Sequence, residues 1–300
     1  MKRAVSISIG SSSRDKVIET TLLGEKIRLE RIGTDGDMQR AAQLFAELDG
    51  HVDAFGVGGT NLALQVGERA YPLHSVQFLV DGVHHTPIAD GSGLKNTLEA
   101  RLANFIETHL EVPDEKRRAL ITSGTDRWGM THGFLQAGYD CVIGDFMFAL
   151  GLPLPLRSEK AVKRAARLIL PIASRLPFKW LYPTGEKQEQ REPKWEEHFA
   201  WSHVIAGDCH FITHYMPDSL EGKIIATNTT TVSDVELFTR AGVAHLVTST
   251  PVYEGRSFGT NLMEAALIAV SGKGRALHKE EILALLSELN LEPQLQTLHK

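Results

Sequence analysis

The chain has 300 residues, of which 42% are apolar and 23% charged, and its formal net charge is −5 at pH 7. This composition is typical of a globular protein, and it shows neither the basic stripe of a nucleic-acid-binding protein nor an apolar run of the roughly 18 residues that a membrane span needs. The two cysteines, Cys141 and Cys209, do not suggest a disulfide framework. We therefore expect a cytoplasmic protein, without a signal peptide and with neither nucleic-acid nor membrane partners.

The first part of the chain alternates short apolar strands with helices. Period-two or continuous apolar runs that end at glycines predict strands over 4–10, 25–33, 52–59 and 86–90, and a hairpin over 61–73. Apolar residues at helical spacing predict helices over 36–50, 74–83 and 94–110. The polar segment 111–118 contains a proline and is interpreted as a domain boundary.

The second part repeats this alternation. We predict strands over 119–124, 139–146, 203–211, 223–228 and 244–251, and helices over 128–137, 158–174, 233–241, 261–271 and 279–289. The segment 176–199 is irregular, polar and rich in proline, and we expect it to lie over a site, with Lys179, Tyr182 and Lys187 covering a substrate; a plain surface excursion is the alternative.

Both parts predict an α/β fold, because short apolar strands between helices are typical of parallel sheets covered on both faces. We expect two α/β domains with a cleft between them, the C-terminal one a Rossmann-like doubly wound parallel sheet. The predicted boundaries are 1–113 for the substrate-side domain, 114–275 for the NAD(P)-binding domain and 276–300 for a C-terminal helix. The apolar helix near 260–272 either closes a domain or meets a second protomer, which leaves a homodimer open.

A loose glycine loop follows the strand at 119–124. Gly124 and Gly129 stand at a strand-to-helix turn, where small residues let backbone N–H groups approach a pyrophosphate; Thr125 lies in the same loop. Asp145 follows the next strand about 20 residues on, as a ribose-binding acid would. Asp145 favours NAD, whereas Arg127 in the loop favours the 2′-phosphate of NADP, and ordinary loop glycines are the alternative interpretation.

Small polar residues also follow two later strands. Asn228 and Thr248 stand where "KIIATN" and "AHLVTSTP" end, and we expect both to contact the cofactor; helix capping is the alternative. The segments "CVIGDFMF" and "HVIAGDCHF" share a strand that ends in Gly-Asp, which is either a turn signal or a pair of ligand-facing aspartates.

The segment "TPIADGSGLKNTLE" (86–99) is the richest in chemistry in the first part. Asp90 ends a strand, a glycine turn follows, and Lys95 begins a helix, so the two residues are candidates for a proton-transferring pair. A solvated helix lysine is the alternative. Thr60 and Asn61 end another strand of the same domain and are expected on the facing wall of the site.

Thirteen histidines raise the question of a metal site. His84 and His85 are adjacent, and His210 and His214 have the spacing of two imidazoles on one helix face. We expect no metal site, because no third ligand is suitably spaced.

Several segments together resemble bacterial proteins of the quinate 5-dehydrogenase or quinate/shikimate dehydrogenase-like family. They include "TPIADGSGLKNTLE", "LPFKWLYPTGEKQ", "IAGDCHFITHYMP", "GKIIATNTTT" and "GRSFGTNLMEA". The resemblance covers nearly the whole chain. It implies an N-terminal substrate domain, a C-terminal NAD(P)-binding domain and NAD(P)-linked oxidation of a ring hydroxyl. The lysine motif N-V-T-x-P-x-K of characterised members is absent, and Lys95 stands in a comparable position.

These observations favour an oxidoreductase that uses NAD or NADP and acts on a small anionic substrate, a polyhydroxy carboxylate such as quinate or shikimate. A ligand-binding or regulatory protein without catalytic activity on the same fold is the main alternative. A hydrolase or transferase that uses the "DGSGLKNT" loop is a third.

Overall fold

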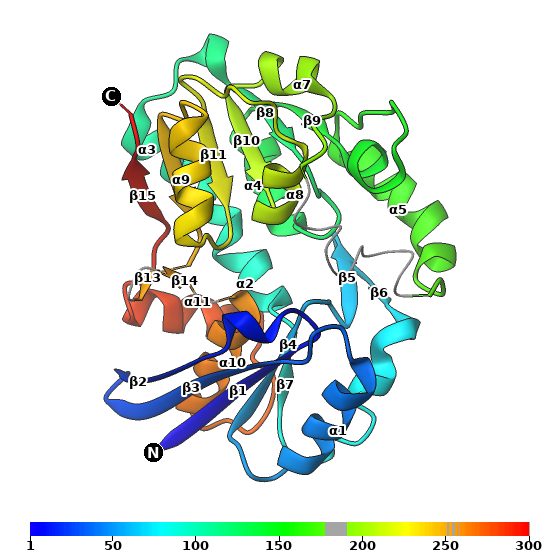
Figure 1. Cartoon of the computed structure of the whole chain (residues 1–300), viewed down its shortest axis with the longest axis vertical. Coiled ribbons are helices and arrows are strands. Elements are labelled where there is room, and N and C mark those ends of the chain that lie inside the picture. Colours follow the sequence, from blue (N-terminus) through cyan, green and yellow to red (C-terminus); the bar gives the residue numbers. More distant parts are fainter. Residues whose placement is uncertain (178–190, 251, 254–255, 258, 300) are drawn as a thin grey trace.

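The protein is an α/β fold with two sheet-bearing regions, which lie one above the other in Figure 1. The computed structural model describes residues 1–177, 191–250, 252–253, 256–257 and 259–299, with the side chains of 251–258 left out. Lys179, Tyr182 and Lys187, expected above the substrate, lie outside the described residues.

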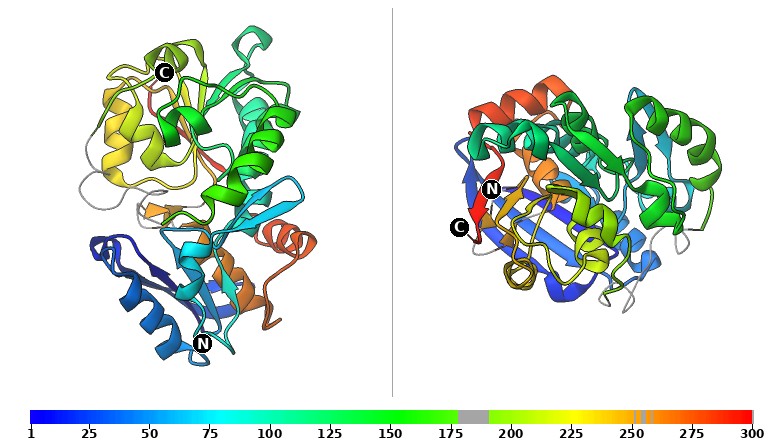
Figure 2. Two further views of the ribbon diagram at one scale, coloured as in Figure 1. Left: turned by 90° about the vertical axis from the view of Figure 1, so that its right-hand side faces the viewer. Right: turned by 90° about the horizontal axis from the view of Figure 1, so that it is seen from above.

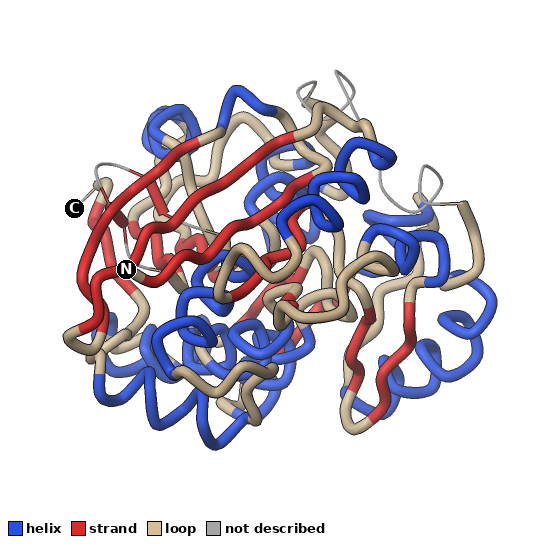
Figure 3. Tube along the Cα trace, turned by 90° about the horizontal axis from the view of Figure 1, so that it is seen from below, coloured by secondary structure: helices blue, strands red, loops and turns tan. Residues whose placement is uncertain are grey.

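The first sheet contains β1 (Lys2–Ser8), β2 (Lys16–Leu22), β3 (Glu25–Gly33), β4 (Ala54–Gly58) and β7 (Ile88–Ala89) in the order β2-β3-β1-β4-β7. Strand β1 is central and parallel to both β3 and β4, whereas β2 and β3 form an antiparallel hairpin. The strands lie side by side when the molecule is seen from below (Figure 3). Helix α1 (Met38–Leu48) is amphipathic, and its Phe45 packs edge-on against Phe55 of β4.

The second sheet contains β8 (Arg118–Ile121), β9 (Asp140–Ile143), β10 (Val204–Gly207), β11 (Ile224–Thr227), β12 (His245–Thr248) and β15 (Gln294–Thr297). Its order is β15-β12-β11-β10-β8-β9, and all neighbours are parallel except β12 and β15. The strand order reverses at β8, which pairs with β9 on one side and β10 on the other.

The remaining elements connect or flank these sheets. The short helices are η1 (Ser12–Arg14), η2 (His74–Leu79), η3 (Glu99–Arg101), η4 (Asp114–Lys116) and the π-helix η5 (Asp145–Ala149). The α-helices are α2 (Ser92–Thr97), α3 (Leu102–Leu110), α4 (Trp128–Gln136), α5 (Glu159–Ala173), α7 (Glu196–Trp201), α8 (Cys209–Tyr215), α9 (Val232–Arg240), α10 (Thr260–Ser271) and α11 (Lys279–Glu288). Two hairpins, β5–β6 (Ala63–Val66, Arg69–Pro72) and β13–β14 (Val252–Tyr253, Arg256–Ser257), complete the fold.

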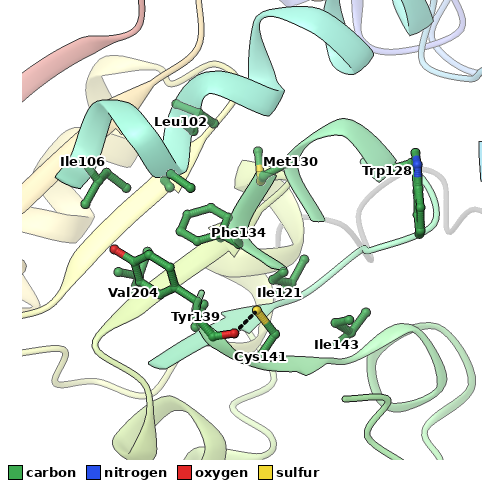
Figure 4. Packing of buried hydrophobic residues seen from close by; sticks show 14 of the residues in the cluster. Leu102, Ile106, Ile121, Trp128, Met130, Phe134, Tyr139, Cys141, Ile143 and Val204 are labelled. Carbon is green, nitrogen blue, oxygen red and sulfur yellow. Dashed lines mark hydrogen bonds between the residues drawn. The ribbon is translucent and has the colours of Figure 1, made fainter. Parts of the chain in front are cut away.

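One large apolar core lies between the second sheet and helices α3 and α4 (Figure 4). Phe134 of α4 meets Tyr139 edge-on at 5.0 Å between ring centroids, and the Cys141 thiol donates a hydrogen bond to the carbonyl of Tyr139. Leu102 and Ile106 of α3 are fully buried in the same cluster. The helical run that carries Lys95 is therefore held at its far end by the core of the second sheet.

Helix α10 follows the second sheet in the chain but packs on the first. Its buried residues join a core cluster with Ile27, Leu29 and Ala54 of the first sheet. After α11 the chain returns, and β15 adds an antiparallel edge to the second sheet. Both views of Figure 2 show this orange helix against the blue strands. The packing thus crosses the boundaries at 113 and 275 that we drew from the sequence.

Several elements differ from the sequence predictions. The predicted strand 203–211 is wrong in its second half, because β10 ends at Gly207 and α8 starts at Cys209. Asp208 caps α8, since its side chain accepts a hydrogen bond from the backbone N–H of His210. The predicted helix 94–110 is divided into α2, η3 and α3. No helix in the described residues has the length and apolarity to cross a membrane.

Candidate functional site at the junction of the two sheets

Polar side chains from both regions meet at the ends of parallel strands. Asn61 follows β4 of the first sheet, Asp126 and Arg127 follow β8, and Asp208 and Asn228 follow β10 and β11 of the second. Hydrogen bonds and ion pairs join these residues to one another through Lys95 and Glu99 of the α2–η3 run. The carboxyl ends of strands in open α/β sheets are the usual place for a ligand.

Lys95 lies at the centre of the contact between the two regions. Its side chain is only 8% exposed, although it was also interpreted as a solvated helix lysine. Its Nζ donates a hydrogen bond to Asn61 Oδ1 at 2.6 Å and lies 3.3 Å from Asp126 Oδ1. The Asn61 amide donates to the same Asp126 carboxylate. Lys95, Asn61 and Asp126 therefore form a closed group that contains a half-buried ion pair.

Charge neighbours keep Asp126 ionised. Burial alone raises the pKa of its carboxyl, but the attraction of Lys95 and Arg127 outweighs burial, and the pKa is lowered. Asp126 is thus a carboxylate at neutral pH that faces an ammonium group.

Arg127 forms a second, deeper set of ion pairs. Its guanidinium is 3% exposed and donates to Glu99 Oε1 at 2.6 Å and to Asp208 Oδ2 at 2.5 Å. Burial opposes its charge, but Glu99, Asp208 and Asp126 together raise its pKa. The pKa of Asp208 is lowered because the attraction of Arg127 exceeds the effect of burial.

Asn228 connects this set to β11. Its Nδ2 donates to Asp208 Oδ2 at 3.3 Å, and its Oδ1 accepts from the backbone N–H of Cys209 and from the Thr227 hydroxyl. Asn228 therefore belongs to the network, as a residue that orients Asp208.

At the surface, Arg14 and His210 bridge the two regions. Arg14 Nη1 lies 3.0 Å from His210 Nε2, and both side chains are exposed. Arg14 belongs to η1, directly after β1, and His210 to the first turn of α8. The two regions thus touch through the buried Lys95 group and through this exposed pair.

Gly124, Thr125 and Asp145 form a separate group. The Asp145 carboxylate accepts hydrogen bonds from the backbone N–H groups of Gly124 and Thr125 and from the Thr125 hydroxyl at 2.6 Å. Burial raises its pKa, and these hydrogen bonds oppose the rise. The spacing that predicted a ribose-binding acid thus brings Asp145 to the loop after β8, where it bonds to the loop itself.

Gly129, Thr248 and Asp90 have other surroundings. A Cβ on Gly129 would lie 2.0 Å from the Lys95 carbonyl oxygen, so this glycine serves the contact between α4 and α2. The Thr248 hydroxyl donates to the carbonyl of Thr250. Asp90 accepts from the backbone N–H groups of Leu62, Ala63 and Ser92, and the predicted pair of Lys95 with Asp90 is replaced by Lys95 with Asp126.

Three members of the network did not enter the predicted site: Glu99, Asp126 and Asp208. Asp208 carried a signal in the repeated Gly-Asp strand end. Asp126 lies inside the glycine loop "SGTDRWG", where attention to the glycines hid it. Glu99 has the i,i+4 spacing from Lys95 that places both on one helical face.

Other features of the described residues lie away from this network. Two surface cavities, of about 360 and 490 Å³, both include Asp218 in their linings. No cluster of three or more histidine, cysteine or acidic side chains suited to a metal ion occurs in the described residues.

Comparisons with known proteins place the sequence in families without assigned activity. Residues 93–298 match the model of DUF8754, a domain of unknown function, and residues 3–90 match that of DUF8753, also a domain of unknown function. A search of curated proteins finds no match.

Similar solved structures are distant. The glucose-galactose binding protein GanP of Geobacillus stearothermophilus is 10% identical, with 99% of this chain and 97% of that chain covered and a TM-score of 0.39. The malic enzyme of Entamoeba histolytica is 10% identical, with 85% and 53% covered and a TM-score of 0.36. A dipicolinate synthase polypeptide of Bacillus halodurans is 12% identical, with 95% and 98% covered and a TM-score of 0.31.

Proposed function

The chain belongs to the DUF8754 family, and we propose that it is an NAD(P)-dependent oxidoreductase that acts on a ring hydroxyl of a polyhydroxy carboxylate such as quinate or shikimate. The observation that carries the proposal is the Lys95–Asp126 ion pair, closed by Asn61 at the junction of the two sheets. A lysine held by a carboxylate at a strand-end site is suited to exchange a proton with an alcohol.

The proposed reaction needs one proton acceptor from the protein. Oxidation of a secondary alcohol transfers a hydride to the nicotinamide ring and releases the hydroxyl proton. Lys95 and Asp126 receive that proton as a pair, because the Asp126 carboxylate stabilises the ammonium form of Lys95. Asn61 holds both groups in place and keeps the lysine directed toward the junction.

The strand order supports a Rossmann-like, doubly wound second sheet. Its parallel strands run β9-β8-β10-β11-β12, so the order reverses between β8 and β10. In such sheets the ligand crevice lies outside the carboxyl ends of the strands at that reversal. We propose a cleft there, bounded by the Asp126–Arg127 loop, Asp208 and, on the first sheet's side, Asn61.

The predicted nucleotide residues differ in how well they suit a dinucleotide. Asn228 and Arg127 lie in the network at the reversal point. Gly124, Thr125 and Asp145 have donors and acceptors bound to one another, and Gly129 is closed off by the Lys95 carbonyl. The glycine loop in this conformation therefore does not fit a pyrophosphate, and no step is derived through that loop.

The test is an assay of the purified protein with quinate or shikimate and with NAD⁺ or NADP⁺, followed by the absorbance of the reduced nicotinamide. Lys95→Met and Asp126→Asn are each expected to lower kcat by about 10²–10⁴-fold, the usual contribution of general acid–base catalysis. Lys26→Met on β3 is the matched control, because Lys26 is an exposed lysine far from the junction in the fold. Absence of nicotinamide reduction in all four combinations, or full activity of Lys95→Met, would reject the proposal.

A second candidate, a non-catalytic small-ligand binding or regulatory protein, is favoured by the Asp145 contacts. A carboxylate that already accepts three hydrogen bonds from Gly124 and Thr125 has no need of a ribose. Thermal unfolding separates the two candidates, because a ligand that binds the native state raises Tm. A rise with quinate or shikimate alone, with no response to either nucleotide and no turnover, would support the binding protein.

A further inference from the structure

Two ion pairs lie side by side between the α2–η3 run and the loop after β8. Lys95 and Glu99 are one helical turn apart, and Leu98 between them has helical backbone angles. Their partners, Asp126 and Arg127, are consecutive in the loop. The charge order on the helical run is positive then negative, and on the loop it is negative then positive, so only one register pairs all four charges.

We infer that Arg127 is a positioning residue, which Glu99 and Asp208 fix so that Asp126 is held against Lys95. The inference rests on the proposed function, since it assigns a role around the same proton-transferring pair. It also replaces the predicted contact of Arg127 with a cofactor phosphate.

Burial distinguishes the pair that sets the register from the pair that faces the junction. The side chains of Arg127 and Glu99 are 3% and 0% exposed, whereas those of Lys95 and Asp126 are 10% and 23% exposed. A fully buried ion pair is costly to break, because either partner alone would be an uncompensated charge away from water. The Arg127–Glu99 pair therefore fixes the loop, and the more accessible pair takes its geometry from it.

Asp208 supplies the other anchor. It accepts from Arg127 Nη2 at 2.5 Å and is itself held by Asn228 and by the backbone N–H of His210. Arg127 is thus tied to the end of β10 as well as to the helical run. Both terminal nitrogens of its guanidinium are engaged, which leaves none of them to meet a phosphate.

The structure also shows what Arg127 would do without Glu99. Its Nε has no hydrogen-bond partner among the described residues and lies 3.9 Å from Asp126 Oδ2. With Glu99 neutralised, the attraction of Asp126 for Arg127 has one competitor fewer, and the guanidinium moves toward it. Asp126 would then turn from Lys95 to Arg127, and Lys95 would lose its carboxylate partner.

The experiment measures the reactivity of Lys95 in the full-length protein. Acetic anhydride acetylates exposed, unpaired lysines, and mass spectrometry gives the rate for each site. In Glu99→Gln we expect Lys95 to be acetylated about tenfold faster than in the wild type, which corresponds to the loss of about 1.4 kcal/mol of protection. Arg127→Lys, which keeps the charge but loses the two-armed geometry, is expected to change the rate in the same direction.

Glu107→Gln is the matched control. Glu107 also pairs with an arginine, Arg117 at 2.5 Å, and lies on α3 two turns beyond Glu99. It should leave the acetylation rate of Lys95 unchanged. Should Glu99→Gln fail to fold, the Arg127→Lys variant decides. An unchanged Lys95 rate in the folded variants, or an equal rise in Glu107→Gln, would overturn the inference.

Kinetics separate this inference from the proposed function. If the wild type oxidises quinate or shikimate, Glu99→Gln should lower kcat with little change in KM, since Glu99 acts on the proton-transferring pair and not on substrate binding. If the wild type shows no activity, the proposed function fails, whereas the acetylation rates still test whether Arg127 positions Asp126.

Discussion

Glu264 is a buried carboxyl group that supports the helix of Lys95 from a distant part of the chain. It lies on α10 with 6% exposure, and its Oε2 accepts a hydrogen bond from the backbone N–H of Leu94 in the first turn of α2. Helix α2 has no side-chain cap of its own, because Gly91 stands at its N-cap. Burial and the nearby Asp90 raise the pKa of Glu264 to about 7.

This raised pKa predicts a stability that depends on Glu264 between about pH 4.5 and pH 7. In this interval the native state retains a proton that the unfolded state releases, so the contribution is fully present below the ordinary value of 4.5 and is lost as pH rises to about 7. The full effect is about 3 kcal/mol, from 1.36 kcal/mol per pKa unit. The lowered pKa values of Asp126 and Asp208 act at more acidic pH.

Glu264→Gln should remove this dependence, since glutamine keeps an oxygen for the Leu94 N–H without the ionisation. Denaturant unfolding at pH 5 and pH 8 measures it. The wild type is expected to lose stability relative to the variant between these two values. Parallel changes in both proteins would contradict the assignment to Glu264.

Sequence reasoning found single residues where a motif required them and failed where a partner came from elsewhere in the chain. Lys95 was identified from the strand–glycine–helix pattern, and the structure brings it to the junction. Its partner Asp126 is 31 residues away, and nothing local distinguishes it from a turn aspartate. Asp145 was placed at the correct strand end, but its hydrogen bonds with Thr125 depend on the loop conformation, which spacing does not specify.

Helix α4 crosses the α2–η3 run at a very short distance, which two glycines allow. A Cβ on Gly129 would lie 2.0 Å from the Lys95 carbonyl oxygen, and one on Gly133 would lie 2.4 Å from that of Ala100. Both obstacles are backbone atoms within helical segments, so they cannot give way as a flexible side chain would. The glycines interpreted as a nucleotide loop thus include one, Gly129, whose role is helix packing.

Gly129→Ala should therefore destabilise the protein by about 1–3 kcal/mol or more, as overpacked sites do, even though alanine is the better helix former. The midpoint of urea unfolding measures the loss. Gln136→Ala in the last turn of α4 is the control, because Gln136 is exposed and should change stability by less than about 0.5 kcal/mol. Equal stability of Gly129→Ala and the wild type would show that α4 and α2 are not packed as described.

At this scale the sequence predicted the regular elements well and their ends less well. The strand 25–33 is confirmed, since apolar alternation over nine residues has no competing interpretation. The short helix α8 was missed because its apolar residues continue the run of β10, and only Asp208, its cap, marks the change. Strand β15, "QLQT", has too few apolar residues for its pattern to predict a strand.

The two regions are interwoven through the order of the chain. Helix α10 lies on the first sheet, with Leu262, Met263, Leu267 and Ile268 almost fully buried there, although more than 140 residues of the second region precede it. No local pattern in α10 shows which sheet it covers, because its apolar face suits either. The division at residue 113 was therefore drawn where the sequence shows a boundary, and the packing extends beyond it.

A fragment of residues 1–113 should consequently fail to fold alone. Removing α10 exposes one face of the first sheet, and four large buried side chains of this kind contribute roughly 1.5–3 kcal/mol each. Their sum is comparable with the whole stability of a domain, about 5–15 kcal/mol. Circular dichroism of the fragment should show little cooperative unfolding. A design that joins residues 1–101 to residues 259–291 through a flexible glycine–serine linker restores the missing helix and should recover a cooperative transition. Cooperative unfolding of fragment 1–113 by itself would show instead that the first sheet is an independent unit and that α10 adds little to it.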